Sequence, residues 1–168
     1  MATKNLRDGV LTLSDGDTPT PNTLELTLEE GDLNFTETTN KIVVKDRGRL
    51  DHVRDGDEEQ LTVSFTLKYV ELIKQSTASA PTPYEALKNI GAASTWVTTD
   101  TYCGGVYSLD LLFKVIAPCD TEQDELITLS DFYVTSIEFK EGDEYNTLSV
   151  EGESLLTTPT VTKVTKTP

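Results

Sequence analysis

The sequence predicts a mainly β protein with one short α-helix. The first observation is a period of two in the apolar residues, which is clearest in 61–69 and 107–115 and is typical of half-buried strands. The second is one segment, 82–91, whose residues at both ends and apolar spacing favour a helix. The third is the length of 168 residues, which suits a single domain with its own core.

Strand signals follow one another along most of the chain. The expected strands are 23–30, 33–36, 42–44, 61–69, 107–115, 126–139 and 145–154. The alternation is cleanest in 61–69, where five apolar residues face one way and four polar residues face the other. The last two strands are expected to form a long hairpin around the turn residues 141–144.

The one helical segment has the sequence TPYEALKNIG. Thr82 is a good N-cap residue, and Pro83 fits the first helical position because its missing N–H costs nothing there. Leu87 and Ile90 supply an apolar stripe, and Gly91 ends the segment. We therefore expect a helix of about two turns.

Three segments lack these patterns. Residues 14–22 contain turn residues and two prolines, and residues 45–60 are almost wholly charged, so both are expected to be loops. A long charged loop in a compact domain is usually functional or mobile. Residues 157–168 have low complexity, so we expect a single domain over 1–156 followed by a flexible C-terminal tail.

The chain is acidic, with 29 Asp and Glu against 14 Lys and Arg, a net charge of −15. Residues 1–60 hold 14 acids and 7 bases, residues 61–119 hold 4 of each, and residues 120–168 hold 11 acids and 3 bases. A protein that grips nucleic acid needs a basic footprint, so this class is disfavoured. Apolar runs are too short for a membrane helix, and the opening residues lack a signal-peptide core, so we expect cytoplasmic synthesis.

No catalytic, phosphate-binding or metal-binding motif is found, so we expect neither an enzyme nor a cofactor. Two acidic loops could in principle hold calcium, but both miss the known loop spacing, and solvated loop charge is favoured. Their acidic and amide residues are Asp15, Asp17 and Asn22 in one loop, and Asp55, Asp57, Glu58 and Glu59 in the other. Cys103 and Cys119 are expected to be unpaired thiols, with a disulfide as the minority reading.

Several predicted strands have polar faces that carry glutamates. One reading is a solvated outer face, which needs no function. The other is the lining of a water-filled channel made by several subunits. Such an acidic lining would repel DNA phosphates and let DNA slide without sticking.

The order of elements resembles the major tail tube proteins of tailed bacteriophages. The resemblance is carried by the opening residues 1–9, the strand pair 23–37, the segment 41–69 with its Asp-Arg-Gly loop, the helix 82–91 and the terminal hairpin 126–154. It implies a β-sandwich or rolled β-barrel with one short flanking α-helix. It therefore also implies a structural rather than a catalytic protein.

The resemblance further implies homohexameric rings stacked into a hollow tube with an acidic lumen that passes DNA without specific binding. Its partners would be a tape-measure protein, a tail terminator, and baseplate or tip proteins. The protein would be located in the tail of the virion and assembled in the host cytoplasm. Two alternatives stay open: the tube of a type VI secretion or contractile injection system, and a β-sandwich module that binds carbohydrate or protein.

The same resemblance assigns two sets of site residues. Contacts with an adjacent ring or subunit are expected from the 45–60 loop, at Asp46, Arg47, Arg49, Asp51, Arg54 and Asp57. The lumen-lining candidates are Glu25, Glu29, Thr62, Ser64, Thr66, Thr147, Ser149, Glu151 and Glu153. Lys68 shares a strand face with three of them and departs from a purely acidic lining.

Overall fold

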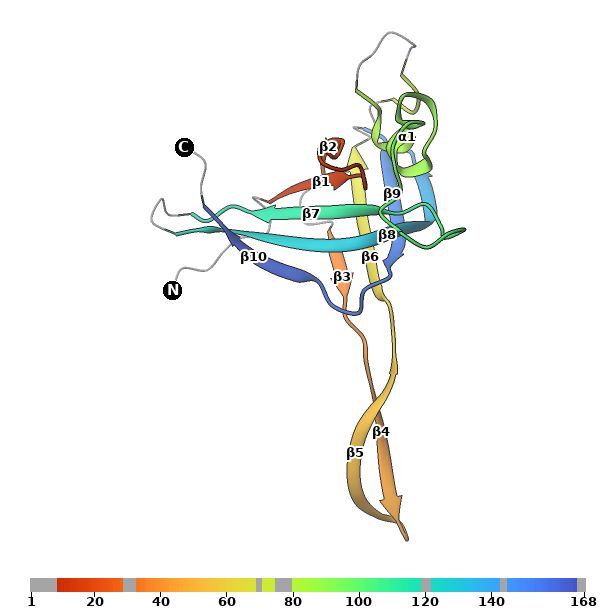
Figure 1. Ribbon diagram of the computed structural model, residues 1–168, viewed down its shortest axis with the longest axis vertical. Helices are drawn as coiled ribbons and strands as arrows, with labels where there is room; N and C mark the ends of the chain where they lie inside the picture. The colour runs from red at the N-terminus through yellow and green to blue at the C-terminus, as the bar shows by residue number, and fades with distance from the viewer. Residues whose placement is uncertain are drawn as a thin grey trace.

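The computed structural model describes residues 9–28, 33–68, 71–74, 80–118, 122–142 and 145–165. The described chain is mainly β, with one short α-helix, as the sequence predicts. Its strands form one eight-stranded sheet and one separate two-stranded sheet. Figure 1 shows the large sheet folded over on itself, with the two-stranded sheet projecting from it as an arm.

The large sheet contains β1 (Val10–Ser14), β2 (Thr23–Leu26), β3 (Asn34–Thr36), β6 (Leu61–Lys68), β7 (Leu109–Val115), β8 (Asp124–Lys140), β9 (Thr147–Ser154) and β10 (Thr160–Val164). The small sheet contains β4 (Thr39–Asp46) and β5 (Arg49–Glu58). The helices are α1 (Pro83–Lys88) and the single 3₁₀ turn η2 (Gly91–Ala93). The order of the large sheet is β2-β1-β7-β8-β9-β6-β3, with β10 also paired to β8, and its strand pairs are antiparallel.

Strand β8 is 17 residues long and belongs to both halves of the large sheet. Its first half pairs with β7 and β10, and its second half pairs with β9. Asp131, between the halves, has a φ of 53°. The register with β7 shifts between Leu129 and Phe132, and the register with β9 shifts between Val134 and Ser136. Such irregularities bend a strand, and in Figure 1 β7 and β1 run across the direction of β6 and β9.

The bend in the large sheet produces two layers, one with β1 and β7 and the other with β6 and β9, and one hydrophobic core lies between them. The inward residues of β6 are at most 2% exposed, and Phe65 packs on Phe132 of β8 with ring centroids 5.9 Å apart. Each such buried side chain contributes about 1.5–3 kcal/mol relative to an exposed one. Among the described residues β2 and β3 end the sheet without pairing to each other, so the fold is an open β-sandwich and not a closed barrel.

The helix begins as predicted. Thr82 Oγ1 accepts a hydrogen bond from the Glu85 N–H at 3.1 Å, and Glu85 Oε2 accepts one from the Thr82 N–H at 2.9 Å. This reciprocal pair is a capping box. The end of the helix differs from the expectation, because Asn89 caps it in the left-handed conformation with φ 54°. Ile90 therefore lies beyond the helix and is 37% exposed, so it does not extend the apolar stripe.

The expectation of an unstructured loop at 45–60 is wrong. These residues form the end of β4, the whole of the ten-residue β5 and the turn between them. Arg47 and Gly48 have φ values of 47° and 82°, and a two-residue turn with both φ positive suits the twist of a hairpin. The period of two was hidden because both faces of this hairpin are exposed and carry charge.

Two strands appear where the sequence pattern predicts none. β1 lies between β2 and β7, and its Leu11 and Leu13 are fully buried. β10 lies within the predicted tail 157–168 and pairs with residues 124–128 of β8. The division of the chain at residue 156 stays a prediction.

Candidate functional site

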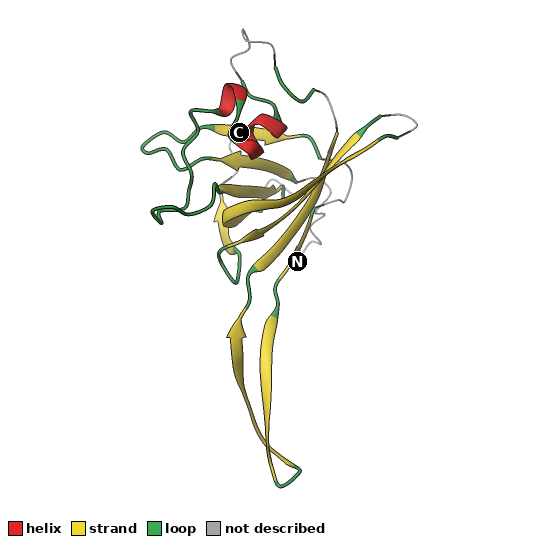
Figure 2. Cartoon of the chain, turned by 90° about the vertical axis from the view of Figure 1, so that its right-hand side faces the viewer, coloured by secondary structure: helices red, strands yellow, loops and turns green. Residues whose placement is uncertain are grey.

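The arm, defined as residues 39–58, is a two-stranded ribbon with both faces exposed. Val43 lies opposite Val53, and their exposed fractions are 51% and 53%. Leu50, near the tip, is 67% exposed. A lone two-stranded hairpin is only marginally stable in water, so this geometry favours a partner that covers the arm. Figure 2 shows the arm projecting from the end of the molecule opposite the helices.

Charge is distributed unevenly along the arm. Within the arm, Lys41 pairs with Asp55, and Asp51 lies 2.6 Å from the His52 ring. In the described part of the chain, the bases nearest the tip, at 45, 47 and 49, form no ion pair. The tip therefore presents positive charge to solvent.

The predicted contact residues all lie on the arm. Asp46, Arg47 and Arg49 surround the turn, and Asp46 is the register partner of Arg49. Asp51 and Arg54 lie along β5, and Asp57 lies where the arm joins the sheet. The structure thus spreads these six residues over the whole length of an exposed element. Their contact role stays a prediction.

A second feature is a groove at the base of the arm, with a volume of about 270 Å³. We call it the base groove. Its lining is rich in carboxylates and includes Glu37, Asp55, Asp57, Glu58 and Glu59, together with Asn40. Asn40 Nδ2 donates to Glu59 Oε1 at 2.5 Å, and Asp55 is paired with Lys41. Within the described residues, no cation pairs with the carboxylates of Glu37, Asp57 and Glu58.

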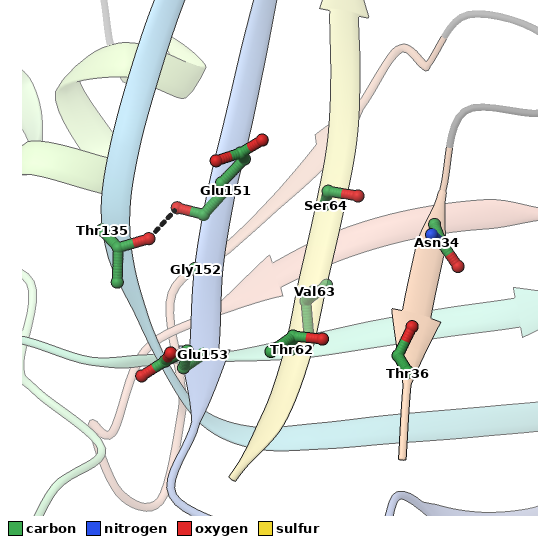
Figure 3. A pocket seen from close by; sticks show the side chains of 9 residues that line it. All are labelled: Asn34, Thr36, Thr62, Val63, Ser64, Thr135, Glu151, Gly152 and Glu153. Atoms are coloured by element: carbon green, nitrogen blue, oxygen red, sulfur yellow. Dashed lines mark hydrogen bonds between the residues drawn. The ribbon is translucent and has the colours of Figure 1, made fainter. Parts of the chain in front are cut away.

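The third feature is the polar face, formed by the outward side chains of β3, β6, β9 and the second half of β8. Cross-strand pairing of β6 with β9 brings seven of the lumen-lining candidates together. The pairs are Thr62 with Glu153, Ser64 with Glu151, Thr66 with Ser149, and Thr147 with Lys68, which is not itself a candidate. A hollow of about 300 Å³ lies over this face, and Figure 3 shows Glu151 and Glu153 beside Thr62 and Ser64. Thr135 Oγ1 donates to the Glu151 carbonyl at 3.1 Å.

The other two lumen candidates do not join this group. Glu25 is exposed on β2, at the opposite edge of the large sheet from β3. Glu29 lies outside the described residues. The lining role of all nine residues stays a prediction.

The structure adds polar-face residues that the sequence analysis did not single out. Asn34 and Thr36 of β3 lie opposite Ser64 and Thr62. On β8, the Tyr133 hydroxyl donates to Glu153 Oε2 at 2.6 Å and lies 2.9 Å from Gln60 Oε1. Strand alternation alone could not place these residues, because their neighbours depend on sheet order and on the register shift between Val134 and Ser136.

The Asp15 carboxylate holds the 14–22 loop. It is 4% exposed and accepts hydrogen bonds from the Asn22 N–H at 2.6 Å, the Asn22 Nδ2 at 2.8 Å and the Val97 N–H at 3.2 Å. Burial opposes ionisation, but these donors and Asp17 N–H hold the pKa of Asp15 below its ordinary value. N–H groups therefore occupy the carboxylate oxygens of Asp15, one of the three residues that the calcium reading assigned to a metal.

Within the described residues, no group of three or more His, Cys, Asp or Glu side chains is arranged to hold a metal ion. In the same part of the chain, no helix is long and apolar enough to cross a membrane. Cys103 is exposed and has no disulfide partner among the described residues. Cys119 lies outside the described residues, so the question of their pairing stays open.

Comparison with known proteins gives structural neighbours only. No protein-family model matches the chain, and no curated protein matches it. A chain of the sheath/tube terminator of PVC, an extracellular contractile injection system, superposes with a TM-score of 0.59 at 8% identity, covering 96% of this chain and 98% of that chain. A chain of the tube-terminating cap of the anti-feeding prophage gives 0.59 at 11% identity, covering 98% and 93%.

A chain of the PVC sheath-tube complex gives a TM-score of 0.54 at 9% identity, covering 96% of this chain and 93% of that chain. At these identities the likeness is one of fold, and it extends over nearly the whole of each chain. The fold is a tail-tube-like β-sandwich, as the resemblance in the order of elements predicted.

Proposed function

We propose that this protein is a structural subunit of a tail tube, in a bacteriophage or a related contractile injection system. The observation that carries the proposal is the polar face, a continuous hydrophilic surface over four strands of a tail-tube-like sandwich. A monomeric binding module needs no such surface together with a bare arm. Both features are expected of a subunit that lines a channel and contacts its neighbours.

The subunits are proposed to form homohexameric rings that stack into a tube. The open sheet edges support this proposal, since β2, β3 and β10 each have an edge without a strand partner among the described residues. Exposed edges are liabilities in a monomer, and closing them between neighbours removes them. The arm, with Asp46, Arg47, Arg49, Asp51, Arg54 and Asp57, would contact the adjacent ring or subunit.

The polar face is proposed to line the lumen. The hydroxyls of Ser64 and Thr62 lie opposite the carboxylates of Glu151 and Glu153, so this part of the surface is hydrophilic and acidic. DNA carries about one negative charge per 1.7 Å of duplex axis and would be repelled from such a wall. DNA would therefore pass without specific binding.

In this role the protein would assemble on a tape-measure protein and meet a terminator at one end and baseplate or tip proteins at the other. It would belong to the tail of the virion, assembled in the host cytoplasm. Two of the neighbours described above belong to the terminator and the sheath-tube complex of a contractile injection system, and the third belongs to the tube-terminating cap of the anti-feeding prophage. These neighbours support a role as a tail component, but they do not distinguish a bacteriophage tail from an injection system.

A second candidate is a tube terminator. Two neighbours, the terminator chain and the cap chain, superpose with TM-scores of 0.59, against 0.54 for the chain of the sheath-tube complex. In that role the protein would close the tube as a single ring and would not polymerise. The arm then would contact only the last ring of a different protein.

Sedimentation velocity over a wide concentration range tests these readings together. A tube subunit gives very large, concentration-dependent species, whereas a terminator gives one closed ring that stays the same size. A binding module sediments as a monomer at all concentrations, and that result at both low and high salt would refute the tube proposal.

A further inference from the structure

We infer that the arm of one copy lies along the next copy in the tube, and that its basic tip docks in the base groove of that copy. This inference rests on the proposed tube function and names the partner surface of the arm. The occupant of the groove is thus a second copy of this chain.

Charge complementarity is the first argument. The tip segment 45–49 contains three bases and one acid, and residues 55–59 at the arm base contain four acids and no base. Glu37 adds a fifth carboxylate to the base groove. The basic side chains of the tip and most of these carboxylates have no ion-pair partner in the described part of the protomer. The basic side chains of the tip and the carboxylates of the base groove could therefore form ion pairs with each other.

The two sets cannot meet within one copy. Arg49 and Glu58 begin and end the same extended strand, β5. Nine residues of strand separate their Cα atoms by about 30 Å at about 3.3 Å per residue. A contact between tip and groove is therefore a contact between copies.

The length of the arm matches the length of the sheet. β4 has eight residues, and so do β6 and β9. In Figure 1 the arm continues the direction of β6, away from the end of the sheet that bears α1. Suppose that the α1 end of one copy meets the arm base of the preceding copy. The arm of the preceding copy then runs along the sheet of the first copy as far as the end opposite α1. The tip of the preceding copy's arm then lies at the base groove of the first copy.

The same displacement creates a second complementary contact. At the α1 end of the polar face, Lys68 and Lys140 flank Thr147 in register, beside the exposed carboxylates of Glu138 and Glu141. Exposed Lys88 lies in the last turn of α1. These lysines would face the acidic arm base of the preceding copy. Lengthwise packing would also cover the exposed Val43, Leu50 and Val53.

A charge-swap experiment tests the docking. The tip variant is Arg47→Glu with Arg49→Glu, and the groove variant is Asp57→Lys with Glu58→Lys. We expect each to reduce the pelletable polymer by about tenfold or more, and the quadruple variant to restore it to within about twofold of wild type. Arg47→Lys with Arg49→Lys keeps the charge and is the matched control, which should polymerise normally. Circular dichroism and thermal unfolding of each variant before assembly verify the fold.

The outcomes separate this inference from the proposed function. If wild type polymerises and the tip variant polymerises equally well, the docking is wrong and the tube function stands. If both double variants fail and the quadruple variant does not recover, the pairing of these two surfaces is wrong. If folded wild type forms no polymer, the proposed tube function itself fails.

Cross-linking gives a second readout. Arg49→Cys with Glu58→Cys, in a background with Cys103→Ser and Cys119→Ser, should give a ladder of covalent oligomers when the assembled protein is treated with a short bismaleimide. Each single-cysteine variant should give no ladder, since one thiol cannot extend a chain of copies. Absence of the ladder from a polymer that forms normally would overturn the inference.

Discussion

The Tyr133 hydroxyl on β8 donates a hydrogen bond to Glu153 Oε2 on β9 at 2.6 Å, and the two residues are direct register partners. Burial, and then the neighbouring carboxylate, raise the pKa of Tyr133, so the hydroxyl keeps its proton and remains a donor at neutral pH. This bond joins the long bent strand to the acidic part of the polar face. It fixes one carboxylate of the proposed lumen wall while Glu151 stays exposed.

Replacing Tyr133 with Phe removes this bond and leaves the ring in place. Because the acceptor is a charged group in a part-buried pair, we expect the free energy of unfolding to fall by about 1–2 kcal/mol. Urea unfolding measures this change. Tyr102→Phe is the control, since Tyr102 is 83% exposed. Equal effects of the two substitutions would contradict the account.

Gly152 on β9 allows β8 and β9 to approach each other closely. A Cβ atom there would lie 2.3 Å from the Tyr133 carbonyl oxygen and 2.4 Å from Cε2 of the Phe132 ring. Neither the backbone nor the buried ring can move away freely, so Gly152→Ala should destabilise the fold by about 1–3 kcal/mol. An unchanged midpoint of thermal unfolding would show that the two strands are less tightly packed than described.

Asp15→Asn should remove a pH-dependent part of the stability. The folded-state pKa of Asp15 is lowered, so its stabilising contribution is present above the ordinary aspartate pKa of about 3.9 and is lost as the pH falls through the folded pKa. At neutral pH the variant should be less stable by about 1–3 kcal/mol, because an amide cannot accept from all the donors. Unfolding measured from neutral pH downwards should show this difference shrinking below about pH 4. A difference that is constant with pH would contradict the assigned role.

The predictable part of the fold is the part in which one strand face is buried. β6 and β7 are predictable because their inward residues alternate with exposed or part-buried ones. β1 has only five residues, too few to show a pattern, although its leucines are central to the core. The arm lacked the pattern altogether, since no core lies on either side of it.

The candidate site was predictable only in part for a related reason. Thr62, Ser64, Glu151 and Glu153 could be assigned to exposed faces from alternation within β6 and β9. That these faces are one surface depends on the antiparallel register of the two strands. A single sequence does not reveal the order of strands in a sheet. That order places Glu25 away from the polar face and places Tyr133 beside Glu153 on it.

The assignment of the lumen wall can be tested with lysine substitutions. Glu151→Lys turns part of the polar face basic, and assembled tubes should then retain DNA in a filter-binding assay at low salt and release it as salt rises. Glu25→Lys makes the same charge change on the other layer and is the matched control, which should retain no DNA inside the tube. Retention by the Glu25→Lys tubes instead would place the lumen against β2.

The central claim, that this chain is the subunit of a tube, is tested most directly by negative-stain microscopy of the purified wild-type protein at high concentration. The account predicts rings that stack into hollow tubes of uniform width. A strict monomer across salt and protein concentration would contradict it.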